Sequence, residues 1–312
     1  MITMGIQFPT ALGRSSGQAP PTPPIAGCFA RLITRIQPTP TELDRARQYV
    51  STIRARLIVT FKVRRSLAGG SYSRGTFVRG GSDVDLFAVI AQSDITWGAG
   101  YKRSETVLNQ FREELAYRYP TVPIRRDVHA IVVGFAQGPS VDVVPAVFHK
   151  MVDGRPQYLI PDGEGEWMVT SPEQHNLFIH QANERSGGKL KRVAQILKFW
   201  RQCSSTRFAL SSFHVELLLA SSDICRGVKS YAACLTEALQ GLAQRECRAL
   251  QDPLGISGLI PAVKTEGQRE DALASVRYAR DHAKDACVAD YGGNWKEAWQ
   301  RWNTAFNGNF PR

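Results

Sequence analysis

The chain has 312 residues, of which 43% are hydrophobic and 21% charged, with a formal net charge of +11 and six cysteines. This composition excludes a disordered, fibrous or membrane protein and is ordinary for a soluble globular one. No apolar run approaches the roughly 18 to 20 residues that span a bilayer, and the length suggests two lobes or one large domain.

The first 40 residues are expected to form a leader that is partly mobile. They contain the proline-rich run Ala19–Pro24 and lack the positive start and continuous apolar stretch of a secretory signal. An overextended start, with Met4 or a later codon as the true one, is an alternative. Thr41 is expected to cap a long helix, about 42–64, whose apolar residues recur with helical spacing and which is predicted to bridge both lobes.

Three aspartates downstream of this helix are expected to share one face of a small sheet. Asp83 and Asp85 are two residues apart in a predicted strand, so their side chains project to the same side. A second strand, about 128–135, turns and returns as a third strand, about 141–147. That third strand can carry Asp142 onto the face of the first two aspartates.

Such a group of carboxylates predicts a divalent metal and a phosphate-bearing substrate. Ionised carboxylates on one face repel one another, and a hard cation bound through oxygen ligands removes that problem. Two metals about 4 Å apart can clamp the attacking and leaving oxygens of a displacement at phosphorus. Gly70 and Ser71 precede the aspartates as a loop whose backbone N–H groups and hydroxyl can approach a phosphate. Each motif alone is weak evidence, since an Asp-x-Asp is usually a solvated turn. The prediction rests on the combination of the Gly-Ser loop, the Asp-x-Asp and the distant third aspartate.

The rest of the chain predicts an α+β fold, with a nucleotidyltransferase lobe built on a small mixed β-sheet and a helical C-terminal lobe. A helix at about 104–119 precedes the second strand, and residues 158–172 are expected to be an irregular connector. Further helices then dominate, at about 173–184, 189–203, 212–220, 231–250 and 270–289. The expected division is a leader at 1–40, a catalytic lobe at 41–172 and a helical lobe at 173–312, with the substrate cleft between the lobes.

Motifs from both halves carry a family resemblance. The segments Gly70–Thr76, Asp83–Asp85 and Val141–Val143 resemble the active-site core of the polymerase-β-like nucleotidyltransferases. Ile196–Trp200 and Ser211–Glu216 are similar to the helical half of cyclic GMP-AMP synthase, oligoadenylate synthetase and their bacterial relatives, the CD-NTases. The segments that look specifically bacterial are Tyr158–Asp162, Gly165–Trp167 and Thr170–Pro172. The resemblance covers roughly residues 40 to 220.

The resemblance implies roles for individual residues. In the family three acidic positions bind two Mg²⁺ ions, with Mn²⁺ as an alternative, and the matching residues here are Asp83, Asp85 and Asp142. A Gly-Ser loop holds the donor triphosphate, which a lysine and a serine of the helical half also touch; the matching residues are Gly70, Ser71, Lys198 and Ser212. The bland alternatives are an exposed helix position for Lys198 and a helix N-cap for Ser212.

The implied activity is that of a CD-NTase. It joins nucleoside triphosphates, ATP among them, into a cyclic di- or trinucleotide second messenger for antiphage signalling and releases pyrophosphate. One alternative is a nucleotidyltransferase that acts on an RNA end or a protein acceptor. Another is a nucleotide-binding regulatory module without catalysis, which the presence of all three aspartates disfavours. The requirement for a regulatory protein partner stays open.

Other partners are not implied. The cysteines contain no C-x-x-C pair and no matching histidine spacing, so the zinc thumb of the animal enzyme and activation by double-stranded DNA are not implied. They are expected to be small buried residues in a reducing cytoplasm. The positive charge is spread widely and is interpreted mainly as solvated helix faces.

Overall fold

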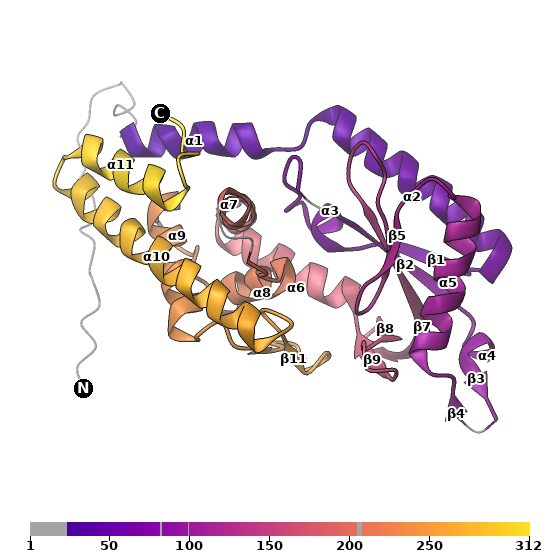
Figure 1. Cartoon of the computed structure of the whole chain (residues 1–312). Coiled ribbons are helices and arrows are strands. Elements are labelled where there is room, and N and C mark those ends of the chain that lie inside the picture. Colours follow the sequence, from indigo (N-terminus) through magenta and orange to yellow (C-terminus); the bar gives the residue numbers. More distant parts are fainter. Residues whose placement is uncertain (1–23, 82, 99, 205–207) are drawn as a thin grey trace.

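The computed structural model describes residues 24–81, 83–98, 100–204 and 208–312. As predicted, the fold is α+β: a seven-stranded mixed sheet lies at one end of the molecule and a bundle of helices at the other (Figure 1). No helix within these ranges is long and apolar enough to cross a membrane. All six cysteines are free, and four of them are buried.

The sheet has the strand order β1-β2-β7-β6-β5, and β8 and β9 extend it alongside the far end of β7. The central pair, β2 and β7, is parallel, whereas the neighbouring pairs are antiparallel. The strands are β1 (Arg65–Ala68), β2 (Val84–Ile90), β5 (Ile124–Arg126), β6 (Ile131–Val133), β7 (Val141–Val152), β8 (Arg155–Pro161) and β9 (Trp167–Thr170).

One face of this sheet is covered by α2 (Pro40–Phe61) and α5 (Ser104–Arg118). Alternate residues of β2 face this core, and Leu86 and Ala88 are buried there against Ile53 and Phe111. The intervening residues of β2, beginning with Asp85, therefore point to the opposite face. The aspartate strand is thus anchored from behind by apolar packing.

The prediction of an irregular connector at 158–172 is wrong, because this stretch holds β8 and β9. Asp153 and Gly154 connect β7 to β8, and both have positive φ angles, 49° and 72°. A two-residue Asp-Gly loop with both residues in the left-handed region is the turn that a tight hairpin requires. The hairpin returns the chain along β7, and Tyr158 is buried against that strand.

Part of the predicted leader is a core helix. Residues 1–23 lie outside the described ranges, but α1 (Pro24–Ile36) packs into the helical core with Phe29 and Leu32 almost fully buried. The ring of Phe29 lies 5.1 Å from that of Trp302, edge to face. This spacing of apolar residues gives α1 one wholly buried face, so the expectation of a mobile segment does not hold for these residues.

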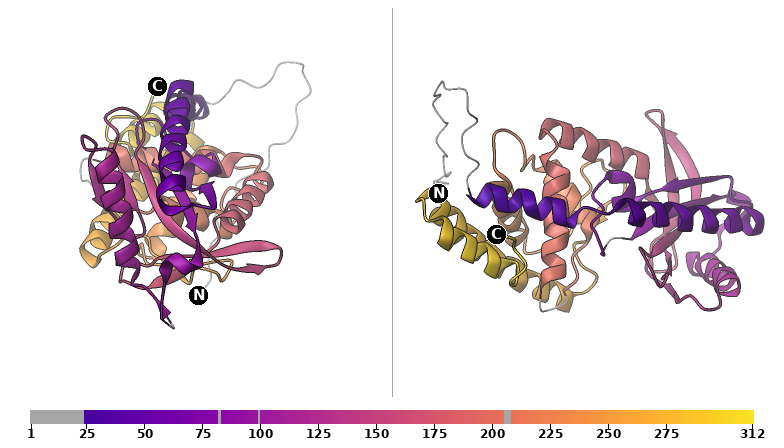
Figure 2. Two further views of the ribbon diagram at one scale, coloured as in Figure 1. Left: turned by 90° about the vertical axis from the view of Figure 1, so that its right-hand side faces the viewer. Right: turned by 90° about the horizontal axis from the view of Figure 1, so that it is seen from above.

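The predicted bridge between the sheet and the helices is made by two helices in succession. α1 packs among the helices and α2 packs under the sheet, and the two follow one another along one side of the molecule, with a bend between them (Figure 1 and Figure 2). Thr39 caps α2, rather than the predicted Thr41: its side chain accepts a hydrogen bond from the backbone N–H of Glu42, whose carboxylate reaches back to the N–H of Thr39.

The remaining helices form one hydrophobic core with α1. The predicted helix at 231–250 ends at Gln244, and the structure adds α11, which the sequence did not indicate. These helices are α6 (Pro172–Arg185), α7 (Lys189–Cys203), α8 (Ser212–Ser221), α9 (Tyr231–Gln244), α10 (Glu266–Tyr291) and α11 (Trp295–Ala305). Short elements complete the fold: α3 (Gly70–Arg74), α4 (Gln92–Ile95), β3 (Thr96–Trp97), β4 (Gly100–Tyr101), β10 (Leu250–Gln251) and β11 (Leu259–Ile260).

Candidate active site

Two of the three predicted aspartates lie side by side on adjacent strands. In the parallel pair β2 and β7, Asp85 is directly opposite Asp142. Residues paired in this way project to the same face of a sheet, so the two carboxylates are neighbours. Asp83 lies two residues before Asp85, at the entrance to β2, and is exposed. The structure therefore brings Asp142 beside Asp85, as the sequence predicted, whereas Asp83 lies just before the paired residues of β2.

The negative charges of these carboxylates are only weakly offset by nearby positive charge, and the pKa values of two of them are raised. Burial, reinforced by Asp83 and Asp85, raises the pKa of Asp142 to about 8. Burial also raises the pKa of Asp85 to about 6, although Arg74 opposes that shift. The Oδ1 atom of Asp142 is buried and has no hydrogen-bond partner in the part of the chain that the structure describes. Asp83 accepts a hydrogen bond from the hydroxyl of Ser140.

This donor set fits a divalent cation. The oxygens belong to carboxylates, the ligands that Mg²⁺ prefers, and the orphaned oxygen of Asp142 is an acceptor that still needs a partner. Within residues 24–81, 83–98, 100–204 and 208–312, no group of three or more His, Cys, Asp or Glu side chains is already arranged to hold a metal. Asp85 and Asp142 are thus preset as neighbours, while the third ligand is not gathered with them.

The predicted donor loop touches this pair. Gly69 donates a backbone hydrogen bond of 2.7 Å to the carbonyl oxygen of Asp85, and α3 begins at the next residue. Gly70 has a φ of +62°, and a Cβ there would lie 1.4 Å from Oδ2 of Asp85. A side chain cannot fit, so the backbone of Gly70 lies directly against the carboxylate. The hydroxyl of Ser71 lies 3.4 Å from the carbonyl oxygen of Asp83.

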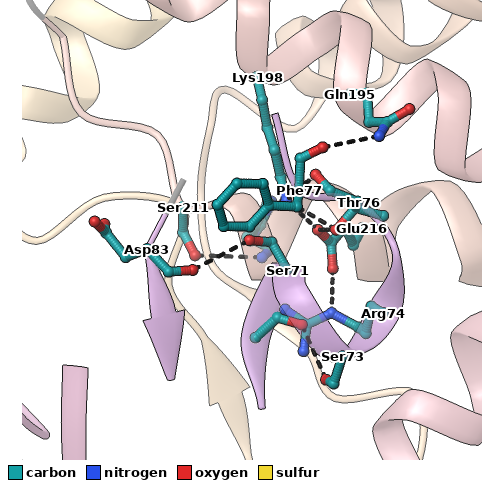
Figure 3. A network of polar contacts seen from close by, with 12 residues as sticks. Ser71, Ser73, Arg74, Thr76, Phe77, Asp83, Gln195, Lys198, Ser211 and Glu216 are labelled. Atoms are coloured by element: carbon teal, nitrogen blue, oxygen red, sulfur yellow. Dashed lines mark hydrogen bonds and ion pairs between the residues drawn. The ribbon is translucent and has the colours of Figure 1, made fainter. Parts of the chain in front are cut away.

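Lys198 is buried, so the alternative that it is merely an exposed helix residue is wrong. It is 4% exposed, and its ammonium lies 2.6 Å from Oε1 of Glu216, 2.9 Å from the hydroxyl of Thr76 and 3.1 Å from the Thr76 carbonyl oxygen (Figure 3). An ammonium has three N–H donors, and these three acceptors can use all of them. Its contact with a triphosphate stays a prediction.

Ser212 is not the N-cap of the bland alternative either. Ser211 caps α8, since its hydroxyl accepts a 3.3 Å hydrogen bond from the backbone N–H of His214. Ser212 is the first residue of the helix, is half-buried, and its hydroxyl makes no hydrogen bond among the described residues. That hydroxyl is a free donor at a helix start, and its phosphate role also stays a prediction.

Glu216 is a residue of this region to which the sequence reasoning gave no role. It is fully buried in α8 and binds Arg74 of α3, the hydroxyl of Thr76 at 2.5 Å, and Lys198 of α7 (Figure 3). Burial by itself raises its pKa, but Arg74 and Lys198 outweigh burial and lower the pKa to about 2. A glutamate inside the apolar run Phe213–Ala220 was the available signal, because buried charges need partners.

Comparison with known proteins identifies the family. The profile of the SMODS family, the Second Messenger Oligonucleotide or Dinucleotide Synthetase domain, matches residues 25–183. The chain belongs to this family. The match begins in α1 and ends in α6, so it contains the donor loop and all three aspartates. The predicted assignment to the bacterial CD-NTases is thereby confirmed, and SMODS proteins are nucleotidyltransferases.

Two curated relatives of this SMODS protein are named cyclic AMP-AMP-AMP synthase. That of Escherichia coli strain MS 115-1 is 25% identical over 167 residues, 51% of this chain and 50% of the relative. That of Acinetobacter sp. strain ATCC 27244 / 9458 is 28% identical over 187 residues, 56% of this chain and 51% of the relative. The matches thus span about half the length of these relatives.

Solved structures of SMODS relatives share the fold. The E. coli MS115-1 CdnC structure with ATP has a TM-score of 0.69 at 19% identity, and the match covers 92% of this chain and 99% of the CdnC chain. CdnC in complex with HORMA-deltaN has a TM-score of 0.68 at 19% identity, and the match covers 92% of this chain and 98% of the CdnC chain. The Vibrio cholerae DncV structure has a TM-score of 0.72 at 13% identity, with 92% of this chain and 96% of its own covered.

Proposed function

We propose that this SMODS protein joins nucleoside triphosphates into a cyclic di- or trinucleotide and releases pyrophosphate. The observation that carries the proposal is the register of β2 and β7, which sets Asp85 beside Asp142 at the donor loop. Two neighbouring carboxylates, one with an unpartnered oxygen, need positive charge. A metal-bound triphosphate brings both the charge and the reacting phosphorus.

Each residue of the site has a task in this reaction. Asp83, Asp85 and Asp142 would hold two Mg²⁺ ions, or Mn²⁺ in their place, and bound ions supply charge neutralisation at the transferring phosphoryl group. The backbone of Gly70 and the hydroxyl of Ser71 bind the donor triphosphate. Most of the catalysis is then positioning and electrostatic stabilisation.

The chemical step moves one proton and exchanges one bond. A ribose hydroxyl of the acceptor attacks the α-phosphorus of the donor, and the bond from that phosphorus to the pyrophosphate oxygen breaks. The carboxylate of Asp142 helps to deprotonate the attacking hydroxyl. Transfer is repeated until the last one, within the linear product, closes the ring: two transfers give a cyclic dinucleotide and three a cyclic trinucleotide, with one pyrophosphate released each time.

Two residues of the helical half support the donor. Ser212 offers its free hydroxyl to the triphosphate. Lys198 contacts a phosphate only by giving up one of its bonds to Glu216 or Thr76. In the arrangement seen, its ammonium holds Thr76, which follows the donor loop directly.

The names of the relatives support the choice of substrate and partner. Two relatives are cyclic AMP-AMP-AMP synthases and one neighbour was solved with ATP, which favours ATP as a substrate here. The complex of CdnC with HORMA-deltaN favours a regulatory protein partner. The role that follows is a second messenger in cytoplasmic antiphage signalling.

A product analysis tests the proposal. The protein is incubated with four nucleoside triphosphates and Mg²⁺ but without an RNA or protein acceptor. The products are treated with phosphatase and analysed by mass spectrometry. A phosphatase-resistant cyclic oligonucleotide is the expected result. Turnover that begins only when RNA or a protein acceptor is added would replace the proposal with the transferase alternative.

A further inference from the structure

Arg125 lies in register with Asp142. It is on the face of the sheet that carries Asp85 and Asp142, called the site face below. β6 pairs with β7 so that Val132 is opposite Asp142, and β5 pairs with β6 so that Arg125 is opposite Val132. Opposed residues share a face, so Arg125 is on the face of Asp85 and Asp142. It is two strands away from Asp142, or about 10 Å at the usual strand spacing.

The packing of the neighbouring residues supports this orientation. Ile124, which precedes Arg125, packs against the core under α2 and α5 on the opposite face. Ile131 and Val133, which flank Val132, are buried in that same core. Since side chains alternate along a strand, Arg125 and Val132 point to the site face. The side chain of Arg125 is exposed there.

Arg125 is also uncommitted. In the described part of the chain it forms no ion pair or hydrogen bond, although its neighbours do: Arg126 binds Glu105 at 3.0 Å, and Asp127 binds Lys264. Arg125 is close enough to Asp142 to oppose the rise in the pKa of that carboxyl. The site face thus carries an exposed guanidinium that forms no direct ion pair with a carboxylate of the described residues.

The direction of the reaction places the acceptor on this side. The donor loop follows β1 and lies against Asp85, so the departing pyrophosphate is on the β1 side of the carboxylates. In an in-line displacement the nucleophile approaches opposite the leaving group. The acceptor nucleotide therefore comes from the side of β6 and β5, where Arg125 lies.

We propose that Arg125 binds the triphosphate of the acceptor nucleotide, an inference that rests on the proposed function. A guanidinium is permanently charged and presents a planar fork of donors that matches phosphate oxygens. The same contact holds the triphosphate of the linear intermediate during the second transfer. Arg125 is a substrate-binding residue in this assignment, and its stem is not part of the core.

The experiment compares Arg125→Ala and Arg125→Lys with Arg54→Ala. Arg54 is an exposed arginine of α2, which covers the opposite face of the sheet, and it serves as the matched control. The ATP concentration for half-maximal rate is expected to rise about 10- to 100-fold in Arg125→Ala and less in Arg125→Lys. Thermal unfolding of the Arg125 variants stays that of the unchanged protein, and Arg54→Ala matches the unchanged protein in both measurements.

Equilibrium binding separates the two nucleotide sites. The probe is an ATP analogue with a methylene bridge between the α- and β-phosphates, titrated calorimetrically in Mg²⁺. The unchanged protein is expected to bind two equivalents; Arg125→Ala weakens one of them, and Ser71→Ala weakens the other.

The outcomes distinguish this inference from the proposed function. If the unchanged protein binds two equivalents and Arg125→Ala does the same with equal affinity, the assignment of Arg125 fails and the proposed function stands. If the unchanged protein binds no analogue, the proposed function fails and the inference falls with it. The binding measurement decides even where turnover awaits a partner.

Discussion

The carboxylate pair on the sheet and the Glu216 cluster treat charge in opposite ways. At the pair, like charges meet with little compensation, and burial raises the pKa of Asp142 to about 8. In the cluster, the fully buried Glu216 meets two cations and a hydroxyl, and its pKa is lowered to about 2. Both regions are largely buried. The charges next to each carboxylate, rather than the depth of burial, therefore decide whether its pKa rises or falls.

The difference teaches which region awaits a ligand. The Glu216 cluster is neutralised from within the chain and ties α3, α7 and α8 together. The carboxylate pair is incomplete without a cation from outside, which is what a binding site requires. If the proposed function holds, one region supports the fold and the other performs the chemistry, and variants at each should separate stability from activity.

The largest effect is expected from Asp85→Asn or Asp142→Asn. Either change removes a proposed metal ligand and should lower product formation at least about 1,000-fold, equivalent to roughly 4 kcal/mol. The fold should persist, because an amide relieves the repulsion between carboxylates. Product yield by mass spectrometry and the unfolding temperature measure the two effects, with the exposed Asp44→Asn as control. Synthesis retained in either site variant would contradict the assignment.

Glu216→Gln should show the reverse pattern in stability. It leaves Arg74 and Lys198 buried without their counter-charge, which is expected to lower the free energy of unfolding by about 3–5 kcal/mol. Urea denaturation measures the loss. The control is Glu237→Gln, which breaks a half-exposed ion pair of 2.6 Å with Lys229 and should cost less than about 1 kcal/mol. Equal losses in the two variants would refute the structural role of the cluster.

The two regions should also respond oppositely to pH. Without divalent metal, folded Asp142 holds a proton that the unfolded chain releases, so stability falls as pH rises from 3.8 to about 8. The contribution of Glu216 is present above its ordinary pKa of 4.5 and is lost as pH falls toward 2. Unfolding temperatures across pH 4–8 test the first slope. Asp142→Asn should flatten it, and Mg²⁺ should raise the unfolding temperature most at the alkaline end.

The smallest effects are expected at the start of α8. Ser211→Ala removes the cap and should cost about 1 kcal/mol of stability. Ser212→Ala should leave urea denaturation unchanged and weaken ATP binding by about two- to tenfold, the value of one net hydrogen bond. Calorimetry of ATP binding measures the second effect. If Ser212→Ala binds ATP normally, that serine has no part in the donor site.

The sequence predicted the site where short-range rules determine it. Alternation along β2 turns Asp85 away from the core that buries Leu86, and the glycine before Ser71 is required by its contact with Asp85. The adjacency of Asp142 depended on strand order, which spacing does not contain. From the residues alone, the third strand was expected only to be able to carry Asp142 onto that face, and the parallel register of β2 and β7 now shows Asp142 opposite Asp85.

The failures have physical causes as well. α1 was overlooked because prolines precede it, although Phe29 and Leu32 already had helical spacing. β8 was overlooked because its residues from 157 to 161 are all buried and show no alternation. Lys198 could not be placed from sequence, because its position depends on Glu216, which comes from a different helix. Contacts between distant segments are the part that periodicity does not encode.

The packing of α1 has a consequence for how the protein is made. Phe29 is covered by Trp302 and Phe310, so the earliest described helix, which also packs against α7 and α9, gains its last neighbours only when α11 and the residues after it have been synthesised. Until then its apolar face lacks those rings, and closing so long a loop is slow. Nascent chains on the ribosome should therefore leave part of this helix uncovered until translation is almost complete.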